Sequence, residues 1–209
     1  MLLAGCGAAD PPRQEDPLVV AALGDSITAG NPLFDPDPAS GFGSDERSQY
    51  EYWAERELDG YEFRNCGVFG ERTDEIAARL GDCAEGADLL IVQGGINDIA
   101  QGRPVEDAAA DLREMVAAGK AAGLDVLVAD VLPWNNGHPQ ADAPIARLNR
   151  EIAAIARREG VRLLRFHEEL EDPEEPWTMG PGLTDDGDHP SVEGHRRLGL
   201  LVADRIEAG

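Results

Sequence analysis

The stretch Leu18-Val-Val-Ala-Ala-Leu-Gly-Asp-Ser-Ile-Thr-Ala-Gly30 decides the fold that we expect for this chain. Its apolar run, residues 18–23, predicts a strand that is buried on both faces, as the strands of parallel sheets are. Gly24 ends this run, and a short helical turn is expected to begin directly after it. Ser26 would then lie at the carboxyl end of a parallel strand, where open α/β sheets bind their ligands.

Ser26 alone does not establish a catalytic site. The sequence Gly-Asp-Ser is also common in turns and at the N-termini of helices, where these side chains cap backbone N–H groups. On the other hand, the unpaired N–H groups and the positive dipole of a helix N-terminus favour an anion beside such a serine. The choice between a cap and a nucleophile therefore depends on the rest of the chain.

Strand-like and helical segments alternate along the remaining chain. Further buried strands are expected at 61–66, 87–93, 124–132 and 161–166. Amphipathic helices are expected at 45–58, 73–80, 105–122, 143–159 and 192–207. In the first of these helices, we expect Tyr50, Trp53 and Ala54 to face the core. The alternation predicts a single α/β domain, residues 18–209, with a five-stranded parallel sheet between two layers of helices.

Charge and composition exclude several classes of partner. The 209 residues contain 18 Lys and Arg against 41 Asp and Glu, which gives a formal net charge of −23. Such a surface repels phosphate backbones, so we expect no nucleic-acid partner. No apolar stretch reaches eighteen residues, so no membrane-spanning helix is expected. Histidines and cysteines lack zinc-ligand spacing and the last acidic loop lacks calcium-ligand spacing, so neither a metal nor a cofactor is expected.

The N-terminal segment is similar to a lipoprotein signal. Leu3-Ala-Gly-Cys6 resembles the lipobox of bacterial lipoproteins, whose cysteine receives the lipid, and residues 7–17 are polar and Pro-rich, like a tether. We therefore expect residues 1–17 to be a signal remnant and tether, with Cys6 as the lipid-attachment site. The protein would then be exported, and either lipid-anchored to the cell envelope or extracellular. Only two residues precede the motif, so an upstream start or a chance match are the alternatives.

Cys66 and Cys83 lie 17 positions apart. A disulfide that closes a loop of this length would stabilise an exported protein, and it would leave Cys6 as the unpaired cysteine. The alternative is a pair of buried free thiols. The sequence favours the disulfide slightly, because export is expected.

A serine nucleophile needs a base within hydrogen-bond reach and an acid that orients the base. His189 lies immediately before the last expected helix, and Asp186 lies three residues upstream of it. One tight turn could bring this carboxylate to the imidazole, where it would fix the tautomer and stabilise the imidazolium. The alternative is a solvated acidic loop that caps the helix.

The residues that could carry chemistry share one position in the expected fold. Each follows an expected strand or lies in the last loop, and they are Ser26, Gly70, Asn97, Trp134 and His189. The carboxyl ends of parallel strands meet at one edge of a sheet, so these residues should converge there.

Four motifs in this order resemble those of the SGNH, or GDSL-type, hydrolases over essentially all of 18–209. The first is Gly24-Asp-Ser-Ile-Thr-Ala-Gly30 and the second is Asn65-Cys-Gly-Val-Phe-Gly70. The third is Gly94-Gly-Ile-Asn-Asp98 and the last is Asp186-Gly-Asp-His-Pro190. Each motif is short, but the set of four on a five-strand pattern is specific. The resemblance implies the flavodoxin-like fold of this family.

The resemblance also implies a role for each motif residue. Ser26, Asp186 and His189 would form the catalytic triad. The backbone N–H groups of Ser26 and Gly70 and the side-chain amide of Asn97 would form the oxyanion hole. Phe69 precedes Gly70 where the family often has a small or polar residue, which would narrow the site. Asp25, Trp134 and Asn135 are further candidates for substrate binding, although a plain turn with a packed tryptophan would explain the last two.

The function that the resemblance implies is hydrolysis of carboxylic esters through an acyl-enzyme, with small or medium acyl groups favoured. A small-molecule, carbohydrate or lipid ester would be the substrate, and we expect a monomer. The same triad would also serve a thioesterase or an acyltransferase. A tethered binding module that has kept the fold without the chemistry is the alternative from another class.

Overall fold

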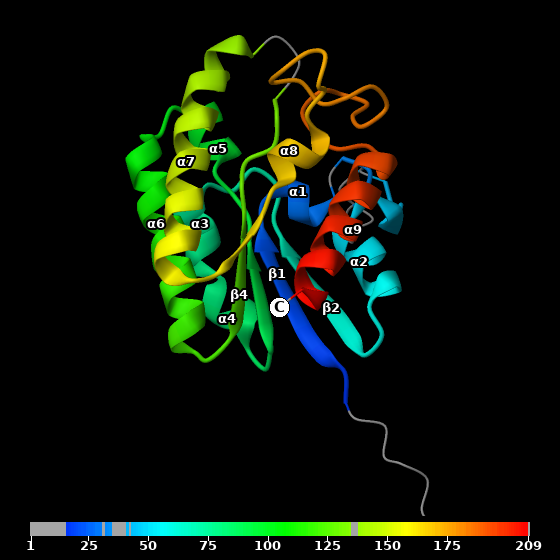
Figure 1. Ribbon diagram of the computed structural model, residues 1–209, viewed down its shortest axis with the longest axis vertical. Coiled ribbons are helices and arrows are strands. Elements are labelled where there is room, and N and C mark those ends of the chain that lie inside the picture. The colour runs from blue at the N-terminus through cyan, green and yellow to red at the C-terminus, as the bar shows by residue number, and fades with distance from the viewer. Residues whose placement is uncertain (1–15, 31, 35–40, 42, 135–137, 209) are drawn as a thin grey trace, which may run out of the picture.

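A computed structural model describes residues 16–30, 32–34, 41, 43–134 and 138–208 (Figure 1). Its central sheet contains β1 (Leu18–Gly24), β2 (Tyr61–Gly67), β3 (Leu89–Val92), β4 (Asp125–Ala129) and β5 (Arg162–Leu164). The strands lie in the order β2-β1-β3-β4-β5, and each neighbouring pair is parallel. The quoted stretch thus supplies a strand near the middle of the sheet, with the next two strands along the chain on either side of it.

Short helices and long ones connect the strands. The short ones are α1 (Ser26–Ala29), α3 (Thr73–Ala78), α4 (Leu80–Ala84), α5 (Ile96–Ala100) and α8 (Phe166–Leu170). The longer ones are α2 (Tyr50–Glu57), α6 (Val105–Ala121), α7 (Asp142–Glu159) and α9 (Val192–Glu207). Single 3-10 turns occupy Glu46–Ser48 and Pro139–Ala141. The helix α9 has the bounds that the sequence predicts.

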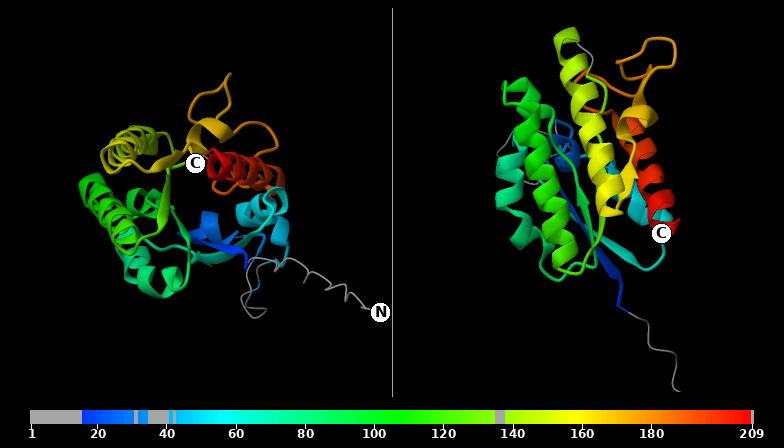
Figure 2. Two further views of the ribbon diagram at one scale, coloured as in Figure 1. Left: turned by 60° about the horizontal axis from the view of Figure 1, so that its bottom comes forward. Right: turned by 60° about the vertical axis from the view of Figure 1, so that its left-hand side comes forward.

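Helices cover both faces of the sheet, as Figures 1 and 2 show. Along β1, Ala21 and Leu23 point into a core that α3, α4, α6 and α7 complete. Val20 and Ala22 point to the opposite face, into a core completed by α1, α2, α8 and α9. Because successive side chains of a strand alternate between its faces, an apolar run is the sequence that a strand between two cores requires. The predicted α/β sandwich is confirmed.

The fourth strand is shorter than the expected 124–132. Beyond β4, the side-chain amide of Asn149 donates to the carbonyl of Val131 at 2.8 Å and accepts the N–H of Val131 at 2.8 Å. These bonds satisfy the backbone in place of a neighbouring strand. The apolar run continues because Val131 and Leu132 are buried, but the sheet does not.

The helix expected at 45–58 is interrupted at Gln49, whose backbone is extended between a 3-10 turn and α2. Residues at the interruption bind the backbone at the end of α1. Ser48 Oγ donates to the carbonyl of Gly30 at 3.1 Å, and Gln49 Nε2 donates to the carbonyl of Ala29 at 3.1 Å. Of the residues expected in the core, Tyr50 and Ala54 are fully buried, whereas Trp53 is half-buried. 

The helix α8 begins at Phe166, the last residue of the expected strand 161–166. Phe166 turns into the core, where its ring meets that of Tyr50 edge-on at 5.4 Å. Asp130, just beyond β4, accepts the N–H of His167 at 2.8 Å and so caps the first turn of α8. Similarly, the helix expected at 73–80 is divided into α3 and α4, because the backbone leaves the helix at Arg79.

The candidate lipid-attachment residue Cys6 and most of the expected tether lie outside the described residues. Within the described part of the chain, none of the helices combines the length and the apolar character that crossing a bilayer requires.

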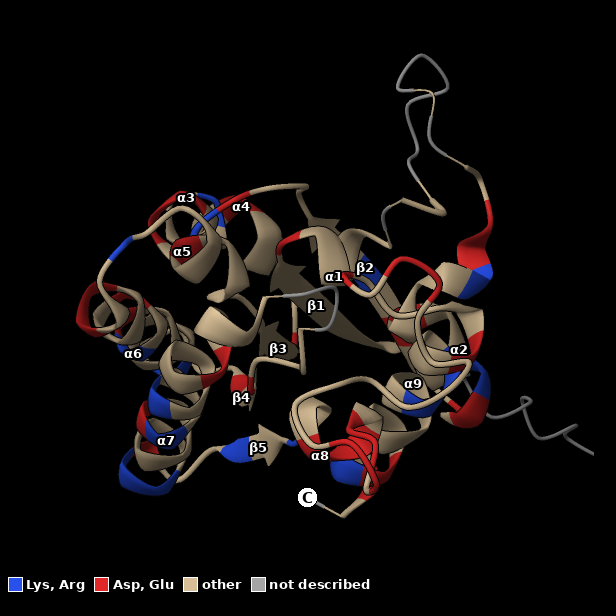
Figure 3. Ribbon diagram, turned by 90° about the horizontal axis from the view of Figure 1, so that it is seen from above, with Lys and Arg blue, Asp and Glu red and all other residues tan. Residues whose placement is uncertain are grey.

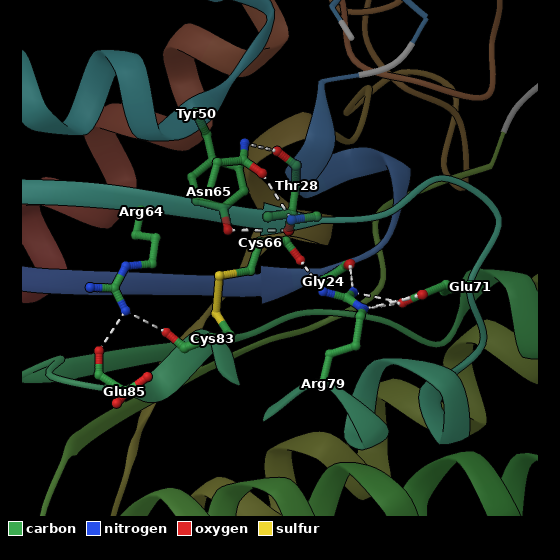
Figure 4. Close-up of a disulfide and its surroundings, with 11 residues drawn as sticks. Gly24, Thr28, Tyr50, Arg64, Asn65, Cys66, Glu71, Arg79, Cys83 and Glu85 are labelled. Carbon is green, nitrogen blue, oxygen red and sulfur yellow. Dashed lines mark hydrogen bonds and ion pairs between the residues drawn. A yellow bond between two sulfur atoms is a disulfide. The ribbon is translucent and has the colours of Figure 1, made fainter. Parts of the chain in front are cut away.

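A disulfide joins Cys66, at the end of β2, to Cys83 in α4, with 6.0 Å between the Cα atoms (Figure 4). Arginine side chains bind the backbone on both sides of it. Arg64 donates to the carbonyls of Cys83 and Glu85 at 2.8 and 2.7 Å, and Arg79 donates to the carbonyl of Cys66 at 2.7 Å. The disulfide therefore ties the edge strand of the sheet to the helical layer beside it.

We predict that the double variant Cys66→Ser/Cys83→Ser loses about 3 kcal/mol of unfolding free energy. The wild-type disulfide joins residues 17 positions apart and so restricts the unfolded chain, and the variant lacks this cross-link. Urea denaturation of the oxidised protein measures this loss. Wild-type protein treated with a reductant should lose a similar amount. Equal stability of the variant and the oxidised wild type would contradict the prediction.

Candidate active site

Ser26 is the first residue of α1, directly beyond the carboxyl end of β1. The side chain of Asp25 accepts the N–H of Ile27 at 2.9 Å, which caps the helix. At the other end, Gly30 adopts φ 90° and donates its N–H to the carbonyl of Ser26 at 3.0 Å. Hydrogen bonds therefore fix both ends of α1, which carries the serine. The serine itself is 5% exposed.

Two glycines allow α1 to lie this close to the sheet. A Cβ atom on Gly67 would lie 2.1 Å from the backbone nitrogen of Ala29, and one on Gly24 would lie 2.2 Å from Thr28 Oγ1. A larger residue at Gly67 would have to move the helix backbone, and one at Gly24 would have to move the side chains of Thr28 and Gln93. The close approach of backbone to backbone sets the position of Ser26 relative to β2.

The side chains of Ser26, His189 and Asp186 form a continuous hydrogen-bonded chain. His189 Nε2 lies 3.1 Å from Ser26 Oγ, and His189 Nδ1 lies 2.9 Å from Asp186 Oδ2. Asp186 Oδ1 also accepts the backbone N–H groups of Asp188 and His189 at 2.8 and 2.7 Å. The structure thus brings together the three residues that the sequence assigns to the triad.

Hydrogen bonding keeps Asp186 ionised. Partial burial of this carboxyl acts to raise its pKa, but the hydrogen bonds from the His189 ring and from the two backbone N–H groups outweigh it, and the pKa lies below its ordinary value. An ionised carboxylate at Nδ1 fixes a proton on that nitrogen and leaves Nε2 to accept one from the serine.

Asn97 and Gly70 lie opposite the serine. Asn97, in α5, donates one hydrogen of its amide to the carbonyl of Glu71 at 2.9 Å. An amide nitrogen carries two hydrogens, so the second remains for a ligand. Gly70 adopts φ 78°, a conformation that favours glycine, and its carbonyl accepts a hydrogen bond from Gln101 at 3.1 Å. The three residues of the expected oxyanion hole, Ser26, Gly70 and Asn97, line one cavity.

This cavity has a volume of about 120 Å³. Its polar lining consists of the serine, the imidazole and the amide just described, together with Asp188. Its apolar lining is Ile27, Phe69, Ile96, Ala100 and Trp134. Phe69, which is expected to narrow the site, lines the cavity; it is 55% exposed, and its ring lies nearly parallel to that of His189, at 6.5 Å.

Trp134 links the cavity wall to the loop that carries His189. Its Nε1 donates to Asp188 Oδ1 at 2.6 Å, and its ring stacks on His138 at 4.0 Å. The structure therefore places this candidate substrate-binding residue beside the triad. Asn135, the neighbouring candidate, lies outside the described residues.

The prediction that Asp25 binds substrate is wrong. Asp25 is fully buried beneath α1. Its carboxylate accepts the N–H of Ile27 instead of facing the cavity. Burial raises the pKa of Asp25 to about 6, against the opposing effect of the hydrogen bonds from Ile27 and Gln93. The sequence could not distinguish a capping aspartate from a binding one, because both follow a strand directly.

Sequence reasoning missed the residues that hold the Gly70 loop. Arg79 forms an ion pair with Glu71 at 2.6 Å and donates to the carbonyls of Cys66 and Gly24 at 2.7 and 3.2 Å (Figure 4). One guanidinium thus ties the loop to the ends of β1 and β2. Arg79 lies on an expected amphipathic helix, where an arginine gives no signal of such a role.

Asp74, Asp98 and Asp111 are close enough to one another to hold a cation. Their charge is met by arginines instead. Arg103 lies 2.6 Å from Asp98 and 2.7 Å from Asp111, and Arg72 lies 3.0 Å from Asp74. This group is an ion-pair cluster that joins α3, α5 and α6.

Comparisons with known proteins find a family match over most of the chain. The profile described as GDSL-like lipase/acylhydrolase family matches residues 22–197. No curated protein matches the chain.

Solved structures share the fold at low sequence identity. A putative lipolytic protein of the G-D-S-L family from Desulfitobacterium hafniense is 20% identical, with a TM-score of 0.75, covering 89% of this chain and 98% of its own. A GDSL-like lipase from Bacteroides thetaiotaomicron is 22% identical, with a TM-score of 0.70 and coverages of 96% and 92%. A catalytic mutant of an acetylxylan esterase from Geobacillus stearothermophilus is 20% identical, with a TM-score of 0.73 and coverages of 91% and 94%.

Asp25→Asn should change how stability depends on pH. The folded protein holds the Asp25 proton more tightly than the unfolded chain does, so this group stabilises the fold below about pH 4, and the contribution is lost as the pH rises through about 6. Asparagine keeps the capping oxygen but does not ionise. As the pH rises from 4 to 7, the wild type should therefore lose up to about 3 kcal/mol of unfolding free energy that the variant does not lose. A difference independent of pH would contradict the burial argument.

Asn97→Ala should lower kcat for an ester by about 10²–10³-fold, the usual effect of removing one oxyanion donor. KM should change little, because the donor acts mainly on charge that develops in the transition state. Steady-state kinetics on a p-nitrophenyl ester measure both values, and thermal unfolding checks that the variant is folded. Turnover at the wild-type rate would remove Asn97 from the oxyanion hole.

Proposed function

Because the chain belongs to the GDSL-like lipase/acylhydrolase family and is a hydrolase acting on ester bonds, we propose that it cleaves carboxylic esters through an acyl-enzyme on Ser26. The hydrogen-bonded chain from Asp186 through His189 to Ser26 carries this proposal. A serine hydroxyl is a weak nucleophile, and an oriented imidazole at 3.1 Å is the partner that activates it.

In the first half of the reaction, Ser26 Oγ attacks the ester carbonyl and its proton passes to His189 Nε2. The carbonyl oxygen becomes negatively charged and accepts hydrogen bonds from the backbone N–H groups of Ser26 and Gly70 and from the Asn97 amide. Neutral donors that are already oriented stabilise this charge without reorganisation. The C–O bond to the alcohol then breaks, and His189 gives its proton to the departing alkoxide, which leaves the acyl group on Ser26.

In the second half, water takes the place of the alcohol. His189 removes a proton from this water as its oxygen attacks the acyl carbonyl, and the same donors bind the oxyanion. The bond to Ser26 Oγ breaks, the proton returns to the serine, and the acid is released. Asp186 remains ionised throughout and stabilises the imidazolium in both halves.

The size of the cavity favours small acyl groups. Its volume of about 120 Å³ is small beside the roughly 300–1,000 Å³ of typical ligand pockets. Such a space suits a short acyl group of roughly two to four carbons better than a long chain. The mainly apolar wall around the oxyanion donors supports the same preference, since a short alkyl group needs no polar partner.

The proposed setting is the cell envelope or its surroundings. The lipobox-like sequence that ends at Cys6, the polar residues 7–17 and a disulfide all fit an exported protein, tethered by its lipid or released. A monomer that acts on a small-molecule or carbohydrate ester is the simplest form of this proposal. The formal net charge of the protein, −23, argues against nucleic acid as a partner.

Hydrolysis of p-nitrophenyl esters from acetate to palmitate tests the proposal. The value of kcat/KM should be highest for the two- to four-carbon esters and should fall for longer chains, which exceed the cavity. Ser26→Ala should lower kcat by a factor on the order of 10⁶. An optimum at palmitate would contradict the assignment of the acyl site, and hydrolysis that survives in Ser26→Ala would contradict the nucleophile.

A further inference from the structure

A second and larger cleft adjoins the catalytic cavity. Its volume is about 560 Å³, and Trp134 lines both spaces. The cleft lies between the start of α7 and the segment that follows α8. Three aromatic rings and three carboxylates define its chemistry, namely those of Trp134, His138, Trp177, Asp142, Asp172 and Glu175. The proposed reaction uses none of these residues, so the cleft needs its own explanation.

The aromatic walls are held in place. Trp134 is fixed by its stacking on His138 and by its hydrogen bond to Asp188. Trp177 adopts φ 70°, the left-handed conformation that non-glycine residues rarely take, and its N–H donates to Glu171 Oε1 at 2.9 Å. Its indole meets the ring of His167 edge-on at 5.2 Å. His138 covers one face of the Trp134 indole, and these contacts hold both indoles at the wall of the cleft.

The segment that carries Trp177 is closed at its base. Glu171 and Met179 form an antiparallel bridge, and the N–H of Asp172 donates to the carbonyl of Thr178 at 2.8 Å. Asp172 Oδ1 accepts the N–H of Glu174 at 2.8 Å, which orients its carboxylate. Figure 3 shows the concentration of acidic residues around α8 and this segment.

His138 is the basic side chain that lines the cleft together with these carboxylates. Within the described residues, no lysine or arginine lines the cleft, and none forms an ion pair with Asp142, Asp172 or Glu175. Elsewhere on the molecule, arginines meet many of the acidic side chains, as in the cluster around Arg103. The cleft thus concentrates negative charge on a protein that is already strongly acidic.

The lining discriminates between two kinds of ligand. A sugar is neutral, so its hydroxyl groups can donate to the carboxylates of the cleft but cannot compensate their charge. The Trp134 N–H is already used by Asp188 and is not available to either ligand. An ammonium group needs only acceptors and aromatic faces, because carboxylates pair with its charge and indole rings attract it through the cation–π interaction.

We propose that the cleft binds an ammonium group on the alcohol portion of the substrate ester, while the acyl group occupies the small cavity beside Ser26. This inference rests on the proposed function. Trp134 would separate the two portions, since it lines both spaces. The charge of −23 would also attract a cationic ester from solution, an effect that salt weakens.

Two esters of equal size test the charge alone. Choline acetate carries a trimethylammonium group, and 3,3-dimethylbutyl acetate replaces its nitrogen with carbon. We expect kcat/KM to be at least about tenfold higher for choline acetate at low ionic strength. The ratio should decrease as sodium chloride is added. Ser26→Ala should abolish hydrolysis of both esters.

Variants of the cleft connect the preference to its carboxylates. Asp142→Asn/Asp172→Asn should bring the ratio of the two kcat/KM values close to one. Glu174→Gln is the matched control. It removes a carboxylate from the same segment, but Glu174 does not line the cleft. It should leave both the ratio and the activity unchanged.

The outcomes separate this inference from the proposed function. Ser26-dependent hydrolysis of both esters at similar rates would overturn the ammonium site and leave the esterase proposal intact. A preference for choline acetate that persists in Asp142→Asn/Asp172→Asn would also overturn the ammonium site. So would similar rates for choline acetate and 3,3-dimethylbutyl acetate together with faster hydrolysis of a sugar acetate. If no ester is hydrolysed in a Ser26-dependent way, the proposed function fails and this inference fails with it.

Discussion

The imidazole of His189 joins two parts of the chain that are 163 residues apart, because its two nitrogens bind Ser26 and Asp186. The bond to Ser26 has the right length only if both backbones are held rigidly. On one side, Gly24 and Gly67 allow α1 to pack directly against the sheet. On the other, Thr184 Oγ1 donates to the carbonyl of His189 at 2.7 Å and accepts the N–H of Gly187 at 2.7 Å. The site therefore depends on local constraints at both ends of the chain as much as on the sheet between them.

Local sequence carried enough information to predict most of this arrangement. The apolar run before Gly24 predicted the strand, and the four short motifs predicted which side chains meet at its carboxyl end. The helical spacing of apolar residues predicted the last helix to the residue, and the structure shows that the Ser191 side chain caps it by accepting the N–H of Gly194 at 3.2 Å. Each of these features is set by residues only a few positions apart.

The features that the sequence did not reveal depend on distant pairs. Asp130 caps α8 from 37 positions away, and Trp134 bonds Asp188 across 54 positions. By sequence, Asp25 is a candidate for substrate binding, yet the fold buries it completely. Spacing along the chain cannot indicate on which side of a short helix such a carboxylate lies. These contacts also determine how the cavity and the larger cleft share Trp134, and so how the acyl and alcohol portions of an ester would be divided between them.

The most direct test of the account is the reaction of the protein with a fluorophosphonate probe, followed by mass spectrometry of the labelled peptide. We expect a single adduct on Ser26 that forms much more slowly in His189→Ala, because the imidazole activates the hydroxyl. A wild-type protein that is not labelled, or that is labelled at another residue, would contradict the assignment of Ser26 as the nucleophile.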